Sequence, residues 1–137
     1  MFTTYFAVLL VVVGIGYAIA FTRNGHVRSA AMGGRVHELH TPASPDDAFA
    51  TIVRIGHPFR CDDKDPSGKI IVMSSSVTFF SWGFLYPVFI HPEGTGSRIQ
   101  IGIHSKFIQM GPIVGHAHDK MRDAINLALS VPAARVA

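Results

Sequence analysis

The stretch FLYPVFIHPEGTGSRIQIGIHSKF, residues 84–107, decides the fold class of this chain. Both of its halves are rich in the β-branched and aromatic residues that favour strands. Between them, PEGTG at 92–96 has the proline and glycines typical of a turn. In the second half, Ile99, Ile101 and Ile103 alternate with polar or small residues, which indicates one buried face and one wetter face. The stretch therefore predicts an antiparallel hairpin.

A second strand pair precedes this hairpin. PFRCDD at 58–63 and KIIVMSSS at 69–76 flank DPSG at 65–68, whose proline and glycine suit a turn between antiparallel partners. The chain is thus expected to form a sheet of four strands. Pro87, inside the third of them, predicts a sheet edge or a bulge because proline cannot donate a backbone hydrogen bond.

Along the chain, one helix is expected before the strands and one after them. Ser44 followed by Pro45 and two acidic residues is typical of a helix start, and the apolar positions that follow predict a helix over 45–55. Near the end of the chain, HDKMRDAINLALS at 118–130 predicts an amphipathic helix. Its apolar stripe comprises Met121, Ala124, Ile125, Ala128 and Leu129.

The fold class that follows is α+β: one N-terminal transmembrane helix and then a small two-layer domain. The domain would consist of a helix, a four-stranded antiparallel sheet and a C-terminal helix. We expect the transmembrane helix at 2–22, a juxtamembrane linker at 23–42, a cytoplasmic domain at 43–131 and a C-terminal tail at 132–137.

The transmembrane expectation rests on residues 2–22, which include no charged residue. As a helix this run would be about 31 Å long, close to the roughly 30 Å hydrocarbon core of a bilayer. A cleaved signal peptide is the alternative, and Ala18-Ile19-Ala20 resembles a cleavage site. That alternative is disfavoured because no Lys or Arg precedes the apolar run, which is also longer than the apolar core of a signal peptide.

Basic residues flank the end of the run. Arg23, Arg28 and Arg35 come before the first acidic residue, Glu38, and cationic flanks tend to stay in the cytoplasm. We therefore expect a single-pass protein of the inner membrane, its N-terminus outside and its C-terminal domain cytoplasmic. The single Cys61 agrees with a reducing compartment.

The net charge of +3 argues against a nucleic-acid partner. The chain has 12 Lys and Arg against 9 Asp and Glu, and the three juxtamembrane arginines account for the whole difference. The remainder is balanced, with no basic face predicted.

Two surfaces are candidates for contacts. In the apolar run, Gly14 and Ala18, and Gly16 and Ala20, are each four positions apart, the spacing at which two membrane helices approach closely. The second is FFSWGFLYPVF at 79–89, whose aromatics could form sheet core, the wall of an apolar pocket, or a surface for a partner or the bilayer. These aromatics are Phe79, Phe80, Trp82, Phe84, Tyr86 and Phe89.

Catalytic and metal signatures are weak. His116 and His118 are two positions apart and would face one side if extended, but no further ligand accompanies them, so they are only weak candidates for a metal. Asp62 and Asp63 beside Cys61 would raise the thiol pKa, which does not suit a nucleophile. We expect no catalytic residue, no cofactor and no enzyme activity.

The segment SSSVTFFSWGFLYPVFIHPEGTGSRIQIGIHSK resembles small uncharacterised bacterial single-span membrane-anchored α+β proteins. The resemblance covers roughly residues 44–130. It implies an α+β fold and a bacterial envelope setting, and it transfers no catalytic residues.

Together these features favour a non-catalytic, single-span accessory subunit of a larger bacterial membrane complex. Its partners would be the membrane and other transmembrane subunits. The alternative is a membrane-tethered binding module for an apolar or lipid-like ligand, with the aromatic strand and the final helix as pocket walls.

Overall fold

A computed structural model of the chain describes residues 1–22, 25–75, 83–106 and 112–130. The helices are α1 (Phe2–Thr22), the short 3-10 helix η1 (Val27–Ser29), α2 (Pro45–Val53) and α3 (Pro112–Ser130). The strands are β1 (Val36–Thr41), β2 (Phe59–Asp65), β3 (Ile70–Ser75), β4 (Phe84–Glu93), β5 (Gly96–Gly102) and β6 (His104–Ser105).

The strands form one antiparallel sheet in the order β1-β5-β4-β3-β2, with β6 paired to β4. Both predicted hairpins, β2–β3 and β4–β5, are confirmed. The expectation of four strands is wrong, because the described sheet has six. One added strand, β1, lies inside the stretch expected to be a linker, and the other, β6, follows a break after Gly102.

Pro87 does not mark a sheet edge, since β4 lies in the middle of the sheet. The residue pairs with Val72 of β3 on one side. On its other side the ladder is interrupted: the last pair with β5 is Val88–Ile101, and the first pair with β6 is Leu85–His104. Proline, which has no backbone N–H to donate, therefore lies where the neighbouring chain changes from β5 to β6.

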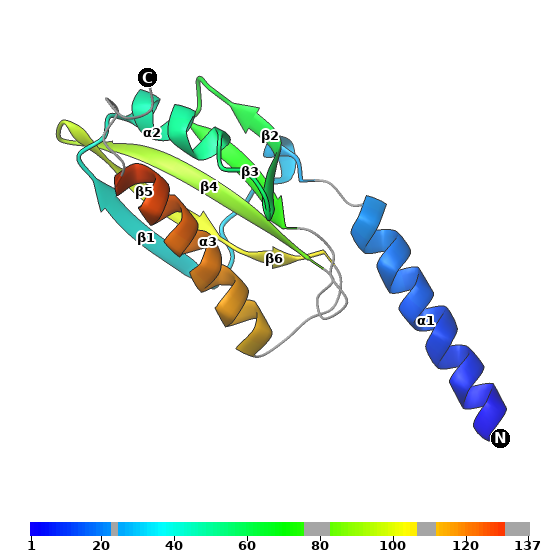
Figure 1. Cartoon of the computed structure of the whole chain (residues 1–137). Coiled ribbons are helices and arrows are strands. Elements are labelled where there is room, and N and C mark those ends of the chain that lie inside the picture. Colours follow the sequence, from blue (N-terminus) through cyan, green and yellow to red (C-terminus); the bar gives the residue numbers. More distant parts are fainter. Residues whose placement is uncertain (23–24, 76–82, 107–111, 131–137) are drawn as a thin grey trace.

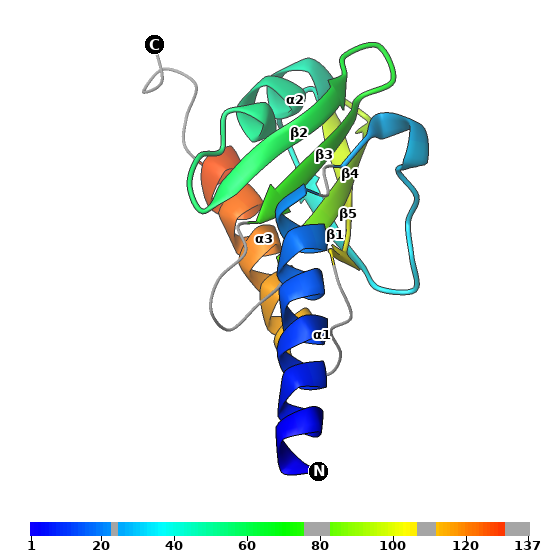
Figure 2. The same cartoon turned by 90° about the vertical axis from the view of Figure 1, so that its right-hand side faces the viewer.

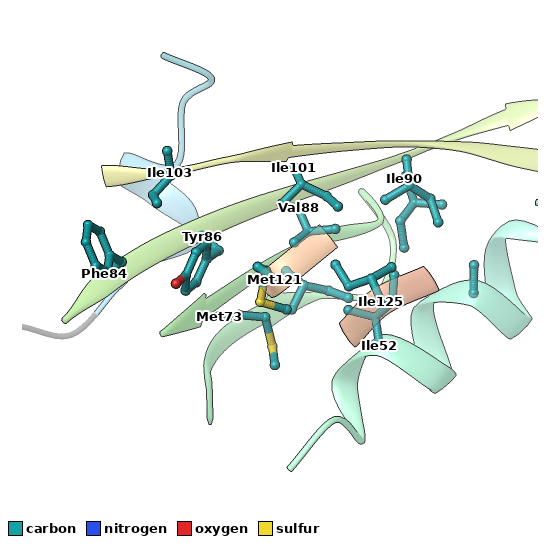
Figure 3. Packing of buried hydrophobic residues seen from close by; sticks show 13 residues of the cluster. Ile52, Met73, Phe84, Tyr86, Val88, Ile90, Ile101, Ile103, Met121 and Ile125 are labelled. Atoms are coloured by element: carbon teal, nitrogen blue, oxygen red, sulfur yellow. The ribbon is translucent and has the colours of Figure 1, made fainter. Parts of the chain in front are cut away.

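The core lies between one face of the sheet and the helices α2 and α3. Alternate residues of the central strands point to this face, among them Tyr86, Val88, Ile99 and Ile101, and all four are at most 1% exposed. Ile52 of α2 and Met121 and Ile125 of α3 close the core from the other side (Figure 3). The predicted burial of alternate isoleucines in β5 is confirmed.

Both predicted helices are present. At the start of α2 the Ser44 hydroxyl accepts a hydrogen bond from the Asp47 amide, as its sequence indicates. In α3, Met121, Ile125 and Leu129 of the predicted apolar stripe pack in or against the core. However, α3 begins at Pro112, before the predicted start at 118.

The helix α1 stands apart from these layers. Figures 1 and 2 both show it extending away from the domain, with the N-terminus at its far end. The expected architecture, an apolar N-terminal helix followed by an α+β domain with a C-terminal helix, is confirmed in this form.

Candidate membrane interface

The helix α1 is apolar on every side and almost entirely exposed. Only 6% of its window Phe2–Ile19 is buried against the rest of the protein, and the window is long and apolar enough to cross a membrane. Side chains around its circumference are open, for example Leu9 at 57% and Val11 at 59% exposure. A core helix of a soluble domain would be covered instead. The helix therefore presents an apolar surface whose exposure to water is unfavourable.

The residues after α1 lie against the second face of the sheet. We call Gly25–Met32 the strap. The Gly25 amide donates to Asp62 Oδ2 at 2.8 Å, and the Val27 amide donates to Asp63 Oδ2, also at 2.8 Å. These two neighbouring carboxylates of β2 act as a clamp on the start of the strap, and we call them the clamp below. Two backbone donors that would otherwise lack partners are thus satisfied.

Asp62 is the more enclosed of the two carboxylates, its side chain only 1% exposed. Its Oδ1 also accepts hydrogen bonds from Ser74 Oγ and Arg60 Nε, each at 2.8 Å. Burial alone would raise the pKa of this carboxyl group, but the hydrogen bonds from Gly25, Arg60 and Ser74 outweigh burial and lower it. Asp62 is therefore a carboxylate at neutral pH, which strengthens each of its hydrogen bonds.

The strap continues across the sheet towards β6. Gly25 is buried, and a Cβ built on it would be 2.2 Å from Val72 Cγ1 and 3.4 Å from Leu85 Cδ2. Near the far end of the strap, His104 Nε2 donates to the Ala31 carbonyl at 2.8 Å. Glycine at position 25 is thus required by close approach of the backbone to the sheet.

The arginines predicted to lie at the membrane surface fall in this region. Arg28, in η1, and Arg35, before β1, are both exposed. Arg23 lies outside the described residues. Arg60, whose side chain is 62% exposed, adds a further cation beside the clamp.

The two candidate metal ligands are separated by the structure. His118 is buried on α3, where its Nε2 donates to the Ile101 carbonyl at 2.7 Å, whereas His116 is exposed. Residues two apart on a helix point in different directions, so the two rings do not converge. Within the described ranges, no group of three or more potential ligands could hold a metal ion.

His118 instead belongs to a small polar cluster between α3 and β1. The centroids of its ring and the His37 ring are 4.1 Å apart, and His37 Nε2 lies 2.9 Å from Asp119 Oδ1. Burial lowers the pKa of His118, because a charged ring would lose its hydration there. The cluster joins the edge strand to the helix.

The aromatic residues of 79–89 divide among different places. Phe84 and Tyr86 point into the core under α3, and burial raises the pKa of Tyr86 to about 12 (Figure 3). Phe89 lies on the opposite face of β4 and is half-buried. Phe79, Phe80 and Trp82 lie outside the described residues. Of the three described aromatics, two therefore serve packing.

The small residues Gly14, Gly16, Ala18 and Ala20 all lie in α1. A Cβ built on Gly14 would meet no atom within 4 Å, so the surface beside it is open to another helix. Nothing in the described domain covers this position.

The strap and its clamp were missed by sequence reasoning, which predicted 23–42 to be a juxtamembrane linker. Each of the two hydrogen bonds joins residues that are far apart in the chain, by 37 positions for Gly25 and by 36 for Val27. No local sequence pattern predicts such contacts. The adjacent acidic pair in a strand, Asp62-Asp63, is the signal that was available, since buried carboxylates require donors.

No protein-family model matches the chain, and a search of curated proteins also finds no match. Among solved structures it is similar to Ara h 8.0201, with a TM-score of 0.53 and 11% identity over 69% of this chain and 93% of the other. It is also similar to the Aha1 dimer from Colwellia psychrerythraea, with a TM-score of 0.50 and 12% identity over 69% of this chain and 91% of the other. At these identities the likeness shows the fold alone. The resemblance to bacterial membrane-anchored proteins stays a prediction.

Proposed function

We propose that this chain is a single-span membrane protein that serves as a non-catalytic subunit of a larger bacterial membrane complex. The helix α1 would cross the inner membrane and pack on other transmembrane helices. The α+β domain would lie on the cytoplasmic side. The observation that carries the proposal is the exposure of an apolar helix long enough to span, of whose window Phe2–Ile19 only 6% is buried by the protein.

The orientation follows from the cations that come after the span. Arg23, Arg28 and Arg35 are all on the C-terminal side of α1, which favours a cytoplasmic domain. Arg28 and Arg35 are exposed and can remain in contact with water or phosphate.

Helix packing is supported by the open surface at Gly14. In a bilayer, helices associate where small residues let backbones approach, because lipid offers no hydrophobic drive for association. The pairs Gly14–Ala18 and Gly16–Ala20 lie on opposite sides of α1; Gly14 is exposed and Gly16 is buried, so the first pair provides the open position.

The alternative of an apolar ligand inside the domain has less support. Such a ligand needs room between α3 and the sheet. Tyr86, Met121 and Ile125 fill that space with exposures of at most 1%.

Purification of the tagged full-length chain in a mild detergent tests the proposal. We expect other membrane proteins to co-purify in fixed stoichiometry. The double variant Gly14→Leu, Gly16→Leu should lose them while remaining in the membrane, because leucine fills the small-residue surface and keeps the helix apolar. The matched control, Val8→Leu with Ile15→Leu, changes a side of the helix that contains neither pair of small residues.

Purification of the wild-type chain alone would contradict the subunit proposal. A lipid retained by that isolated protein would favour the ligand-binding alternative instead. Equal loss of partners from both leucine variants would show that association does not use the small-residue surface.

A further inference from the structure

The connection between α1 and the clamp is very short. Only residues 23 and 24 separate Thr22, the last residue of α1, from Gly25, whose amide is held by Asp62. Three Cα–Cα steps reach at most about 11 Å. The polar layer of a bilayer is about 5–8 Å thick on each side of the hydrocarbon core. If α1 spans the membrane, the clamp must therefore lie at or just beyond the headgroups.

The place of attachment determines which end of the domain is held there. Gly25 is buried against Leu85, the second residue of β4, and Leu85 pairs with His104 of β6. The first turns of α3 lie at the same end, since Tyr86 Oη donates to the Ala117 carbonyl at 3.3 Å. The other end of β4, at Glu93, is about 26 Å away along the strand. One end of the sheet is thus tied to the span.

The strap resists rotation about this attachment. It is held to β2 by two carboxylate hydrogen bonds at its start and to His104 of β6 near its other end. Contacts at both ends fix its path across the sheet. A tether held at one point would leave the domain free to turn, whereas this one does not.

One arginine at the tied end is available to an anionic surface. Arg28 and Arg60 are both exposed there, and Arg60 is paired with Asp62 through its Nε. The clamp carboxylates keep their negative charge and are bonded to backbone amides and to Arg60. The exposed Arg28 is therefore the side chain that can bind phosphate oxygens.

We infer that the strap and its clamp hold the domain on the lipid headgroup layer in one orientation. The start of β4, β6 and the first turn of α3 face the bilayer, and Arg28 contacts anionic lipid phosphate. This inference rests on the membrane span of the proposed function and names the lipid surface as a further partner of the domain.

Two positions on α3 provide a matched pair of probes. Ile113 and Leu127 are both exposed apolar residues, at 50% and 70% exposure. They are about 21 Å apart along the helix, Ile113 being at the tied end. Each would be replaced by cysteine and labelled with a fluorophore, in a Cys61→Ala background that removes the single native cysteine. The full-length chain would be placed in phosphatidylcholine vesicles that carry a nitroxide quencher on the lipid.

We expect quenching at position 113 and none at position 127. A flexible Gly-Ser insertion of about twelve residues between Arg23 and Asn24 adds roughly 20 Å of reach and leaves the clamp intact. In the inserted chain, quenching at position 113 should fall to the level at position 127. Phosphatidylglycerol should restore part of it, and should not do so when Arg28 is replaced by glutamine.

Equal quenching at both positions in the uninserted chain would overturn the inference, as would an insertion without effect. Failure of phosphatidylglycerol to restore quenching would overturn the phosphate contact. Extraction of the same vesicles with alkaline carbonate separates these results from failure of the proposed function. Release of the chain by carbonate would mean that α1 does not span, and both proposals would then fall together.

Discussion

At the scale of single residues, Asp62 joins the strap to the sheet through the amide of Gly25, and it also binds Ser74 and Arg60. Replacement with asparagine removes the charge that strengthens these hydrogen bonds. We expect Asp62→Asn to lower the free energy of unfolding by about 2 kcal/mol. Urea unfolding of residues 25–137 measures this, with the exposed Asp123→Asn as the control. Equal stability of the two variants would contradict the assigned role of Asp62.

The same carboxylate predicts a direction of pH dependence. Because hydrogen bonds lower the pKa of Asp62 in the folded protein, its contribution to stability is present above the ordinary carboxyl pKa of about 3.9. It is lost as the pH falls through the folded pKa. On acidification, the Asp62→Asn variant should therefore unfold at a higher pH than the wild type. Circular dichroism follows the unfolding of both.

Gly25 offers a steric test of the strap. A Cβ at this position would overlap Val72, whereas one at Gly34 would meet no atom within 4 Å. We expect Gly25→Ala to destabilise the protein by about 1–3 kcal/mol, the usual range for overpacking, and Gly34→Ala to leave it nearly unchanged. Thermal unfolding of both variants measures this. A Gly25→Ala variant as stable as Gly34→Ala would mean that the strap does not lie on the sheet.

Because of His118, we expect the free energy of unfolding to fall between neutral and mildly acidic pH. Its pKa is lowered in the folded protein by burial, with His37 and Arg35 adding to the effect. The hydrogen bond to the Ile101 carbonyl and the charge of Asp119 oppose it. Folding therefore favours the neutral ring. This stability is present above the ordinary histidine pKa of about 6.5 and is lost as the pH falls below it.

The check is the free energy of unfolding on either side of that pH. The wild type and the exposed control His116→Gln should both lose stability as the pH falls. His118→Gln keeps an amide that can donate to the Ile101 carbonyl and cannot titrate, so its loss should be smaller. An identical pH profile for His118→Gln and the wild type would contradict the assignment.

At the scale of elements, predictability from sequence followed the strength of local signals. The helix α2 has a capping serine and a proline at its first position, and β5 alternates isoleucine with polar or small residues, so both were predicted. The strand β1 was missed because it is an edge strand of sequence VHELHT, whose inward positions include the polar His37 and Thr41. A half-polar edge has little periodic signal.

The start of α3 was also missed. Pro112 is the first residue of the helix, and proline is favoured there because its fixed φ suits the first turn. The strap could not be predicted, because its contacts with Asp62 and Asp63 depend on tertiary distance and not on neighbouring residues.

The contacts of the strap also allow a prediction of how far the chain can be shortened from its N-terminus without loss of folding. Residues 25–137, without α1, should be soluble without detergent and folded. Residues 36–137 also lack the strap, which uncovers Val72 and Leu85 and leaves the clamp carboxylates without their backbone donors. We expect this shorter chain to be less stable or aggregated. Solubility and circular dichroism of the two chains decide the matter, and equal behaviour would show that the strap contributes nothing.

At the scale of the whole molecule, an α+β domain is fixed closely to an apolar helix. The domain has a filled core, so the exposed apolar surface is concentrated in α1. The small-residue positions of α1 and the tied end of the sheet then provide two different contacts, one with other helices and one with lipid headgroups. Both depend on α1 being in the bilayer.

Alkaline carbonate extraction of membranes that contain the full-length chain, beside residues 25–137 expressed alone, tests this central claim most directly. High pH strips peripheral proteins and leaves bilayer-spanning helices in place. If α1 spans the bilayer, the full-length chain stays in the membrane pellet and residues 25–137 are found in the supernatant. Release of the full-length chain into the supernatant would show that α1 does not span.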